Sequence, residues 1–479
     1  MIETANMRLT TFLVVLIGVG LLACSGAAPT QIDPTPNFDA RGNALVTRSV
    51  PTIVVGQTSV STAIPVSVPT PVPTAIPVPE PTPSPVVIAK YSFSAESSST
   101  KLTNGLSSKS KKFGISVAID GDTIITGDSR DSFEGTDSGS ASVFNISSDT
   151  WIQQAQITAD DIYQGYLFGG AVDIDGDTAV IGATGGAKGA VYVFVLRNGI
   201  WAQQEKLMDI ATDSSAQFGK SVAISENTMV VGAPTDDAPE TSSGSAFVFT
   251  RTDDVWGKVA QLAPSGRIYT LKNNRFGESV AIDSERIYVG AQGDSSTNGT
   301  DSGAVYVFTL SDGSWVEEAK LHASDGDEGD NFGHSISVFN DTLVVGAPAD
   351  DSNGTDSGAT YVFVRNATGE WNEEVKLIAS DGAYDDNFGW SVAVGADVAI
   401  VGALYANANG SDSGSLYTYN RTGTNWSENS ILTGTGTTSN DRLGTSVSIS
   451  GNVAVSGAPG NTEKAKETGA IHVFTAQLR

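Results

Sequence analysis

The chain has 479 residues and a formal net charge of −27 at pH 7, with 54 acidic against 27 basic side chains. This excess of negative charge argues against binding nucleic acid or an anionic membrane surface through a basic patch. The single cysteine excludes an intrachain disulfide and cysteine-rich zinc sites. Many short apolar runs separated by Gly, Asp, Asn and Ser indicate an all-β protein.

The N-terminus is predicted to be a targeting segment. Met7 and Arg8 precede an apolar run from Phe12 to Ala23, which is short for a membrane span and typical of a signal-peptide core. The run ends directly before Cys24, the only cysteine of the chain. Residues 1–23 therefore resemble a bacterial lipoprotein signal, which implies cleavage before Cys24 and its lipidation. An ordinary secretory signal with an incidental cysteine is the alternative.

Residues 24–89 are predicted to be a linker rich in Pro and Thr, densest between Pro65 and Pro85. Proline fixes φ and removes a backbone donor, so no helix or sheet interior is expected here. We expect an extended polyproline-like stalk or a disordered linker, which differ mainly in stiffness. Two or more acyl chains hold a protein stably on a membrane. The predicted location is therefore the cell envelope, lipid-anchored and exposed to the exterior, on the outer membrane or the outer face of the cell membrane.

Residues 90–479 are built from seven copies of one pattern. Each copy opens with a Phe-Gly or Leu-Gly pair, and a further Gly follows fourteen positions after the first residue of the pair. Self-similarity at a period of roughly 55 residues is the mark of a repeat architecture. The pairs are Phe113-Gly114, Phe168-Gly169, Phe218-Gly219, Phe276-Gly277, Phe332-Gly333, Phe388-Gly389 and Leu443-Gly444.

The copy that starts at Phe332 predicts four short strands, at 333–339, 342–347, 359–365 and 371–379. The connections are of hairpin length, so the strands form an antiparallel meander. Both faces of this sheet carry apolar side chains, which need a neighbouring sheet on each side. Radial repetition supplies those neighbours, and the sequence therefore predicts a seven-bladed β-propeller.

The seventh copy ends without a fourth strand. Lys101-Leu102, however, lies eleven residues before Phe113, as Lys376-Leu377 lies before Phe388. We therefore expect an N-terminal strand to complete the last blade and close the ring. Residues 86–93 are a second segment that fits this pairing, instead of Lys101-Leu102 or in addition to it.

The combination of Phe-Gly and Gly-Ala-Pro resembles the FG-GAP repeats of the integrin α-subunit propeller. It resembles most a bacterial variant with Ser-Gly-x-x-Tyr-Val-Phe and Trp-x(4)-Lys-Leu elements, over about residues 96–479. The resemblance implies a propeller that binds proteins or other ligands through one rim. Many such repeats carry a nine-residue calcium loop between the first two strands. Here that connection is a tight turn, as at Asp120-Gly121-Asp122, so those ligands have no counterpart.

Other acidic loops fit two interpretations. Calcium takes six to eight oxygen ligands, which clustered Asp side chains can supply. Alternatively, the Asp and Ser side chains of these loops bond their own backbone in turns. The candidate calcium ligands are Asp325, Asp327, Asp330, Asp350, Asp351, Asp356, Asp381 and Asp385. No other cofactor is expected.

The sequence contains no recognisable catalytic arrangement. His322, His334 and His472 lie in different copies, where surface or turn positions are expected, and no nucleophile elbow, zinc-helix motif or phosphate-binding loop occurs. We therefore expect no enzyme but a monomeric, cell-surface binding module for an extracellular protein or polysaccharide, acting in adhesion or scaffolding through rim loops. The alternatives are a carbohydrate-active enzyme on the same fold or a structural envelope protein.

Overall fold

The computed structural model describes residues 91–94, 99–105, 112–186, 188–209, 215–237, 241–264, 273–295, 297–462 and 468–478. The chain divides after Pro83, and all described residues lie in the second unit, Ser84–Arg479. The predicted signal at 1–23, the lipidation site Cys24 and the linker at 24–89 lie outside the described residues. The described part contains no helix with the length and apolar character that crossing a membrane requires.

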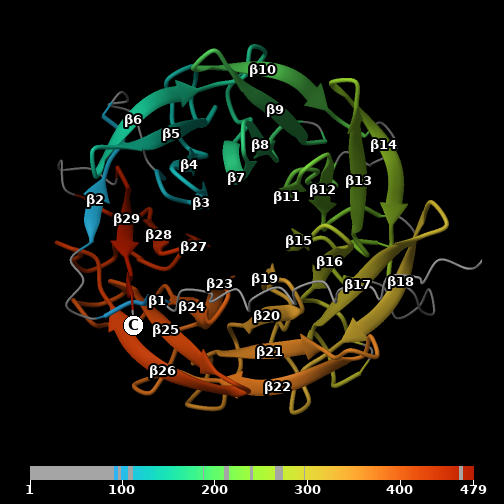
Figure 1. Cartoon of the computed structure of the whole chain (residues 1–479), viewed down its shortest axis with the longest axis vertical. Coiled ribbons are helices and arrows are strands. Elements are labelled where there is room, and N and C mark those ends of the chain that lie inside the picture. Colours follow the sequence, from blue (N-terminus) through green and yellow to red (C-terminus); the bar gives the residue numbers. More distant parts are fainter. Residues whose placement is uncertain are drawn as a thin grey trace, which may run out of the picture. The chain divides into compact units, whose positions relative to one another are not determined.

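Seven four-stranded antiparallel sheets surround a central axis in the described part of the chain (Figure 1). Blade one contains β3 (Ser116–Asp120), β4 (Thr123–Asp128), β5 (Ser140–Ser147) and β6 (Thr150–Ile157), and blade two contains β7 (Phe168–Asp175), β8 (Thr178–Ala183), β9 (Ala190–Arg197) and β10 (Ile200–Leu207). Blade three contains β11 (Ser221–Ser225), β12 (Thr228–Ala233), β13 (Ser245–Thr252) and β14 (Val255–Leu262), and blade four contains β15 (Val280–Ile282), β16 (Arg286–Ala291), β17 (Ala304–Ser311) and β18 (Ser314–Leu321). Blade five contains β19 (Ser335–Phe339), β20 (Thr342–Ala347), β21 (Ala359–Arg365) and β22 (Trp371–Leu377), and blade six contains β23 (Phe388–Val394), β24 (Val398–Ala403), β25 (Ser415–Thr422) and β26 (Asn425–Leu432). Blade seven contains β27 (Ser446–Ser450), β28 (Val453–Ala458), β29 (Ala470–Thr475) and the N-terminal β2 (Thr100–Leu102).

The predicted strands of the fifth copy agree with the structure at most of their ends. β20 and β21 match the prediction, and Asn340 and Asp341 form the tight turn before β20. The first strand begins at Ser335 rather than at Gly333, because Gly333 has a φ of 89°, which lies outside the extended region. The fourth strand ends at Leu377, two residues before the predicted end.

The hydrophobic cores lie between neighbouring blades. Phe332 is fully buried, and its ring makes edge-on contacts with Tyr361 and Phe363, at centroid distances of 5.5 and 5.9 Å. Val305 and Leu321 of blade four belong to the same cluster. The expectation that each sheet shields its sides on its neighbours is confirmed.

The glycine of the Gly-Ala-Pro element allows two blades to touch near the axis. A Cβ atom at Gly346 would lie 1.9 Å from the carbonyl oxygen of Gly389 in the next blade. That carbonyl oxygen also accepts a hydrogen bond from Ser335 Oγ at 2.9 Å. Only glycine permits this approach, and Gly389 itself has a φ of 92°. The Phe-Gly pair and the later Gly are therefore one contact, made across each blade boundary.

Blade seven closes the ring with both ends of the described chain. β2 pairs antiparallel with β29 in the register Lys101↔His472 and Leu102↔Ile471, which confirms the predicted fourth strand. In addition, β1 (Tyr91–Ser92) pairs with β30 (Gln477–Leu478). Tyr91 and Ser92 of the second predicted segment thus pair, but in a separate two-stranded sheet and not as a strand of blade seven, while 86–90 lie outside the described residues.

Candidate functional site: the loop face and the central channel

The two faces of the ring differ in the length of their connections. On one face the first two strands of each blade are joined by short turns, as at Asn340 and Asp341. The opposite face, here called the loop face, carries the connections from the second strand to the third and from the fourth strand to the next blade. In blade five and its junction with blade six these run over 348–358 and 378–387. The acidic candidates Asp325 to Asp385 all lie on the loop face.

Lys376 brings two of the predicted calcium ligands together. Its Nζ lies 2.9 Å from Asp325 Oδ2 and 2.7 Å from Asp350 Oδ2. The Tyr361 hydroxyl donates to both carboxylates at 2.9 Å. Burial alone would raise the pKa of Asp350, but hydrogen bonds from Lys376 and Ser352 outweigh it and hold the pKa below its usual value. A calcium ion bound to Asp325 and Asp350 would have to displace this ammonium.

The same arrangement recurs in other blades. Lys206 Nζ contacts Asp161 Oδ2 at 2.5 Å, and Lys320 Nζ contacts Asp294 at 2.9 Å. Each lysine lies opposite a tyrosine on the neighbouring strand, in the pairs Tyr192↔Lys206, Tyr306↔Lys320 and Tyr361↔Lys376. The Tyr hydroxyl donates to the same carboxylate in each of these blades. We call this unit the lysine clamp. The sequence analysis missed it, although the recurring Tyr-Val-Phe and Lys-Leu elements carried its signal.

Of the remaining acidic candidates, Asp381 accepts a hydrogen bond from the Tyr417 hydroxyl at 2.8 Å, and the others take part in turn or loop hydrogen bonds. Asp327 N donates to Asp330 Oδ2 at 2.7 Å, and Asp356 N donates to Asp351 Oδ1 at 2.8 Å. Asp385 has a φ of 63° and donates its backbone N–H to a neighbouring loop. Among the described residues no group of three or more His, Cys, Asp and Glu side chains is arranged to hold a metal. The geometry favours turn chemistry at these loops, and calcium stays a prediction.

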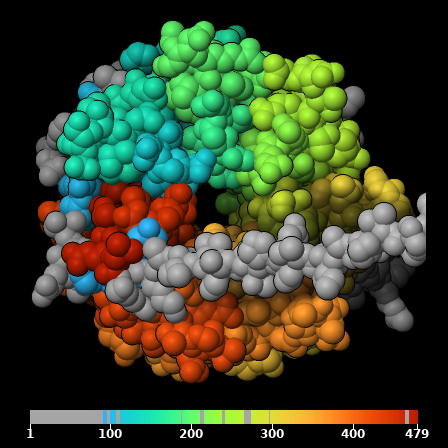
Figure 2. Space-filling view, viewed as in Figure 1, coloured from blue at the N-terminus to red at the C-terminus, as the bar shows by residue number. Residues whose placement is uncertain are grey.

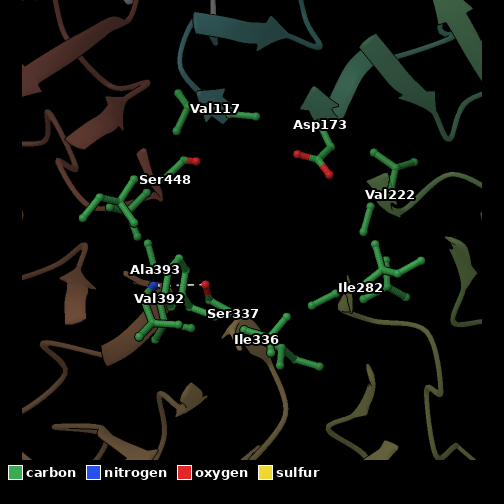
Figure 3. Close-up of a pocket in the computed structure, with 18 of the residues that line it drawn as sticks. Val117, Asp173, Val222, Ile282, Ile336, Ser337, Val392, Ala393 and Ser448 are labelled. Atoms are coloured by element: carbon green, nitrogen blue, oxygen red, sulfur yellow. Dashed lines mark hydrogen bonds between the residues drawn. The ribbon is translucent and has the colours of Figure 1, made fainter. Parts of the chain in front are cut away.

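A channel runs along the axis of the ring, and Figure 2 shows the hollow at its centre. Its cavity of about 320 Å³ is bounded by the first strand of every blade. Asp173 is the one charged side chain among the described residues that line it, and burial raises its pKa to about 7. Its Oδ2 accepts a hydrogen bond from Ile224 N at 2.8 Å. Figure 3 shows Asp173 with part of the apolar lining, namely Val117, Val222, Ile282, Ile336, Val392 and Ala393.

Charged side chains gather where the channel opens toward the loop face. The nearly buried Glu278 carboxylate binds Lys220 Nζ at 3.1 Å and Arg275 at 2.9 Å. Beside it, His334 Nδ1 lies 2.7 Å from Gln292 Oε1, and the His334 ring lies against the Trp390 ring at a centroid distance of 4.5 Å and an interplanar angle of 49°. Burial lowers the pKa of His334 to about 4. Lys220, Glu278, His334 and Trp390 occupy one repeat position, directly after the Phe-Gly pair, and this shared position was the signal for their convergence.

The three histidines have different environments. His322 is exposed, as expected, and His334 is half-buried at the channel mouth. The expectation of a surface or turn position is wrong for His472, which is fully buried in β29 and bonds Ser99 Oγ at 3.0 Å. His472 occupies the position that Tyr361 has in blade five, and burial there, with the charge of Lys101, lowers its pKa to about 3.

Large aromatic side chains are exposed on the loop face. Tyr384 is 71% exposed and Tyr163 is 66% exposed, and Phe133 projects from the adjoining loop of blade one. Backbone hydrogen bonds brace these loops against each other, from Gly165 N to Thr136 O and from Asp385 N to Thr355 O, at 3.0 Å each. These rings are therefore presented on a fixed platform and not on free loops.

Seven sheets around an axis, each closed against the next by a contact between a Phe-Gly or Leu-Gly pair and a later Gly, define a β-propeller of repeated sequence units. The FG-GAP repeat family model matches residues 97–144, 151–194, 201–249, 256–308, 315–363, 371–419 and 426–474. The chain therefore belongs to the FG-GAP repeat proteins. Each matched unit begins with the fourth strand of the preceding blade, so the first unit supplies β2 to blade seven. No curated protein matches the chain.

Proposed function

We propose that this protein is a lipid-anchored, surface-displayed module that binds an extracellular protein or glycan through its loop face, in adhesion or scaffolding. The FG-GAP propeller fits a protein-binding or structural role. The observation that carries the choice of face is the set of exposed aromatic side chains, Phe133, Tyr163 and Tyr384. Exposed tyrosines on a rigid support are the side chains that dominate binding energy at protein interfaces and that stack on sugar rings.

The lipid anchor and the stalk belong to the same proposal. Acylation at Cys24 would hold the chain on a membrane, and the Pro-rich linker would separate the propeller from it. The net charge of −27 suits a soluble exterior surface and disfavours nucleic acid as a partner. Binding without turnover is part of the proposal. Labelling cells with a fatty acid should modify the natural chain and leave a Cys24→Ala variant unlabelled.

The partner can be sought with residues 90–479 on a glycan array and in pull-downs of surface proteins. Once a ligand is found, Tyr163→Ala and Tyr384→Ala should each weaken binding by about tenfold or more, as for aromatic hot spots. Ile200→Ala and Val255→Ala remove exposed apolar side chains beside the short turns of the opposite face and serve as matched controls. Unchanged affinity in both tyrosine variants, or turnover of a bound sugar, would contradict the proposal.

A further inference from the structure

Blade six has lost the lysine of the lysine clamp and keeps one of the two carboxylates that this lysine contacts in blade five. Tyr417 pairs with Ile431 across β25 and β26, in the register that joins Tyr361 to Lys376 in blade five. The sequence places Ala406 where blade five has Asp350, four positions after the Gly of each Gly-Ala element. Two members of the clamp, the ammonium and one carboxylate, are thus replaced by apolar side chains.

The replacement leaves a cavity of about 240 Å³ on the loop face. One acidic member of the clamp remains in place, because Tyr417 still donates to Asp381 Oδ1 at 2.8 Å, as Tyr361 donates to Asp325. The lining residues are Asp381, Ala383, Asp386, Ala406, Asn407, Ala408, Ser415 and Tyr417.

Two buried polar atoms on the walls of this cavity have no partner. Asp386 is only 3% exposed, and while its Oδ2 accepts from Ala383 N at 2.8 Å, its Oδ1 is unpaired. The fully buried Ser415 Oγ is also unpaired. Its counterparts in blades one and three, Ser140 and Ser245, each donate to the carboxylate that blade six lacks. Buried polar groups are rarely left unpaired in folded proteins, so these atoms indicate a ligand.

The unpaired oxygens identify the chemistry of that ligand. Asp386 is an acidic group held out of water, so a cation beside it would stabilise its charged form. An ammonium offers three donors and no acceptor, which suits a carboxylate oxygen, a hydroxyl oxygen and the second acidic group, Asp381. Calcium requires six to eight oxygen ligands, whereas only two carboxylates line this cavity.

We propose that the blade-six cavity binds a primary ammonium group carried on an unbranched alkyl chain, in the manner in which blade five binds the ammonium of Lys376. The chain itself provides the template: Lys376 reaches Asp325 and Asp350 along β22, and an external ligand reaches Asp381, the counterpart of Asp325, together with Asp386. Free alkylamines and the lysine side chain of a protein share this chemistry. The site stands independently of the partner proposed for the exposed tyrosines.

The test is calorimetric titration of the full-length chain with n-pentylamine and with Nα-acetyl-lysine methylamide. We expect saturable one-to-one binding of an amine and none of the Nε-acetylated lysine derivative, which has the same length without the charge. Asp386→Asn should weaken binding at least tenfold. Asp330→Asn is the matched control in blade five, where the lysine of the chain fills the clamp, and it should leave amine binding unchanged.

Ile431→Lys supplies the missing ammonium from within the chain and should abolish amine binding while raising the midpoint of thermal unfolding. Should that variant fail to fold, Asp386→Asn still decides the outcome. Binding of the lysine derivative without pentylamine upholds the site and points to a lysine of a partner protein, and binding of both upholds it for free amines too. Absence of amine binding, binding that survives Asp386→Asn, or displacement of the amine by calcium chloride alone would overturn the proposal.

Discussion

Blade five and blade seven both have four strands, but they obtain the fourth strand from different parts of the chain. Blade five is continuous and ends in a fourth strand, β22, that spans Trp371–Leu377. Blade seven borrows its fourth strand from the N-terminus, and that strand, β2, has only three residues. The third strand of each blade carries a buried side chain that faces the fourth strand. In blade five this is Tyr361, which belongs to a lysine clamp, and in blade seven it is His472, which is hydrogen-bonded to Ser99.

The difference shows that closing the ring has reduced the pairing in one blade. A short strand shields less of its neighbour, and a histidine is tolerated there only in its neutral form, since burial lowers its pKa to about 3. Blade five is stabilised by charge-assisted hydrogen bonds, so removing one of its charges should lower the free energy of unfolding. Blade seven is completed by a strand from the N-terminus and contains a buried histidine, so truncation of that strand and low pH should each lower the free energy of unfolding. Three predictions follow this contrast from the largest expected effect to the smallest.

Deleting residues 1–105 removes β1 and β2 and leaves β29 as an open edge. Ile471 and Val473 lose part of their cover, and burial of such side chains contributes about 1.5–3 kcal/mol each. We expect the free energy of unfolding in urea to fall by about 3 kcal/mol. A chain lacking only residues 1–90 retains both strands and is the control. Equal stability of the two truncated chains would show that the borrowed strand is dispensable.

Lys376→Met breaks the clamp of blade five and leaves the buried Asp350 without its ammonium. Removing one partner of a buried pair costs about 3–5 kcal/mol, and because Lys376 is partly exposed we expect about 2 kcal/mol. Arg197→Met removes an exposed pair with Asp254 and should change stability little.

The acid response of the Lys376→Met variant is a second readout. The pKa of Asp350 is lowered in the folded chain, so its contribution is fully present above the ordinary value of 3.8 and is lost as pH falls through the lower folded value. Over that pH window, the free energy of unfolding measured in urea should fall more for the natural chain than for the variant. Parallel acid profiles would contradict the charge-based account of the clamp.

His472→Phe tests the acid sensitivity of blade seven, and Phe247 fills the matching position of blade three. In the natural chain the folded pKa of His472 is lowered to about 3 from 6.5. Stability is therefore present above pH 6.5 and is lost as pH falls toward 3, because the unfolded chain takes up the proton first. The variant should lack up to about 1.4 kcal/mol per pH unit of that slope between pH 6 and 4. If the free energy of unfolding had the same pH dependence in the natural chain and the variant, His472 would have to take up its proton as readily in the folded chain as in the unfolded one.

The ring could be predicted from the sequence because its information is periodic. The constant spacing from Phe332 to Gly346 encodes the contact between blades, and Lys101-Leu102 marked the borrowed strand by its distance from Phe113. The site could be predicted only in part. Acidic loops show oxygen atoms but not their partners, and Lys376 meets Asp350 only once β21 and β22 are paired in register.

The burial of His472 and the gathering at the channel mouth were missed for a related reason. Both depend on which residues occupy one repeat position in different copies. Aligning His472 with Tyr361 would have placed it inside a blade, and aligning Lys220 with Glu278 and His334 would have placed all three around one axis. Comparison between copies carries this information, whereas each copy taken alone does not.

The pairing of β1 with β30 has a mechanical consequence. Tyr91 and Ser92, at the start of the described residues, pair with Gln477 and Leu478 in a two-residue ladder, and the next pairing along the chain is β2 on β29. Tension applied to the N-terminal side of the propeller would thus be borne first by these few hydrogen bonds, ahead of any of the six continuous blades. The outermost ladder can act as a release point that gives way under load while the remainder of the ring stays assembled.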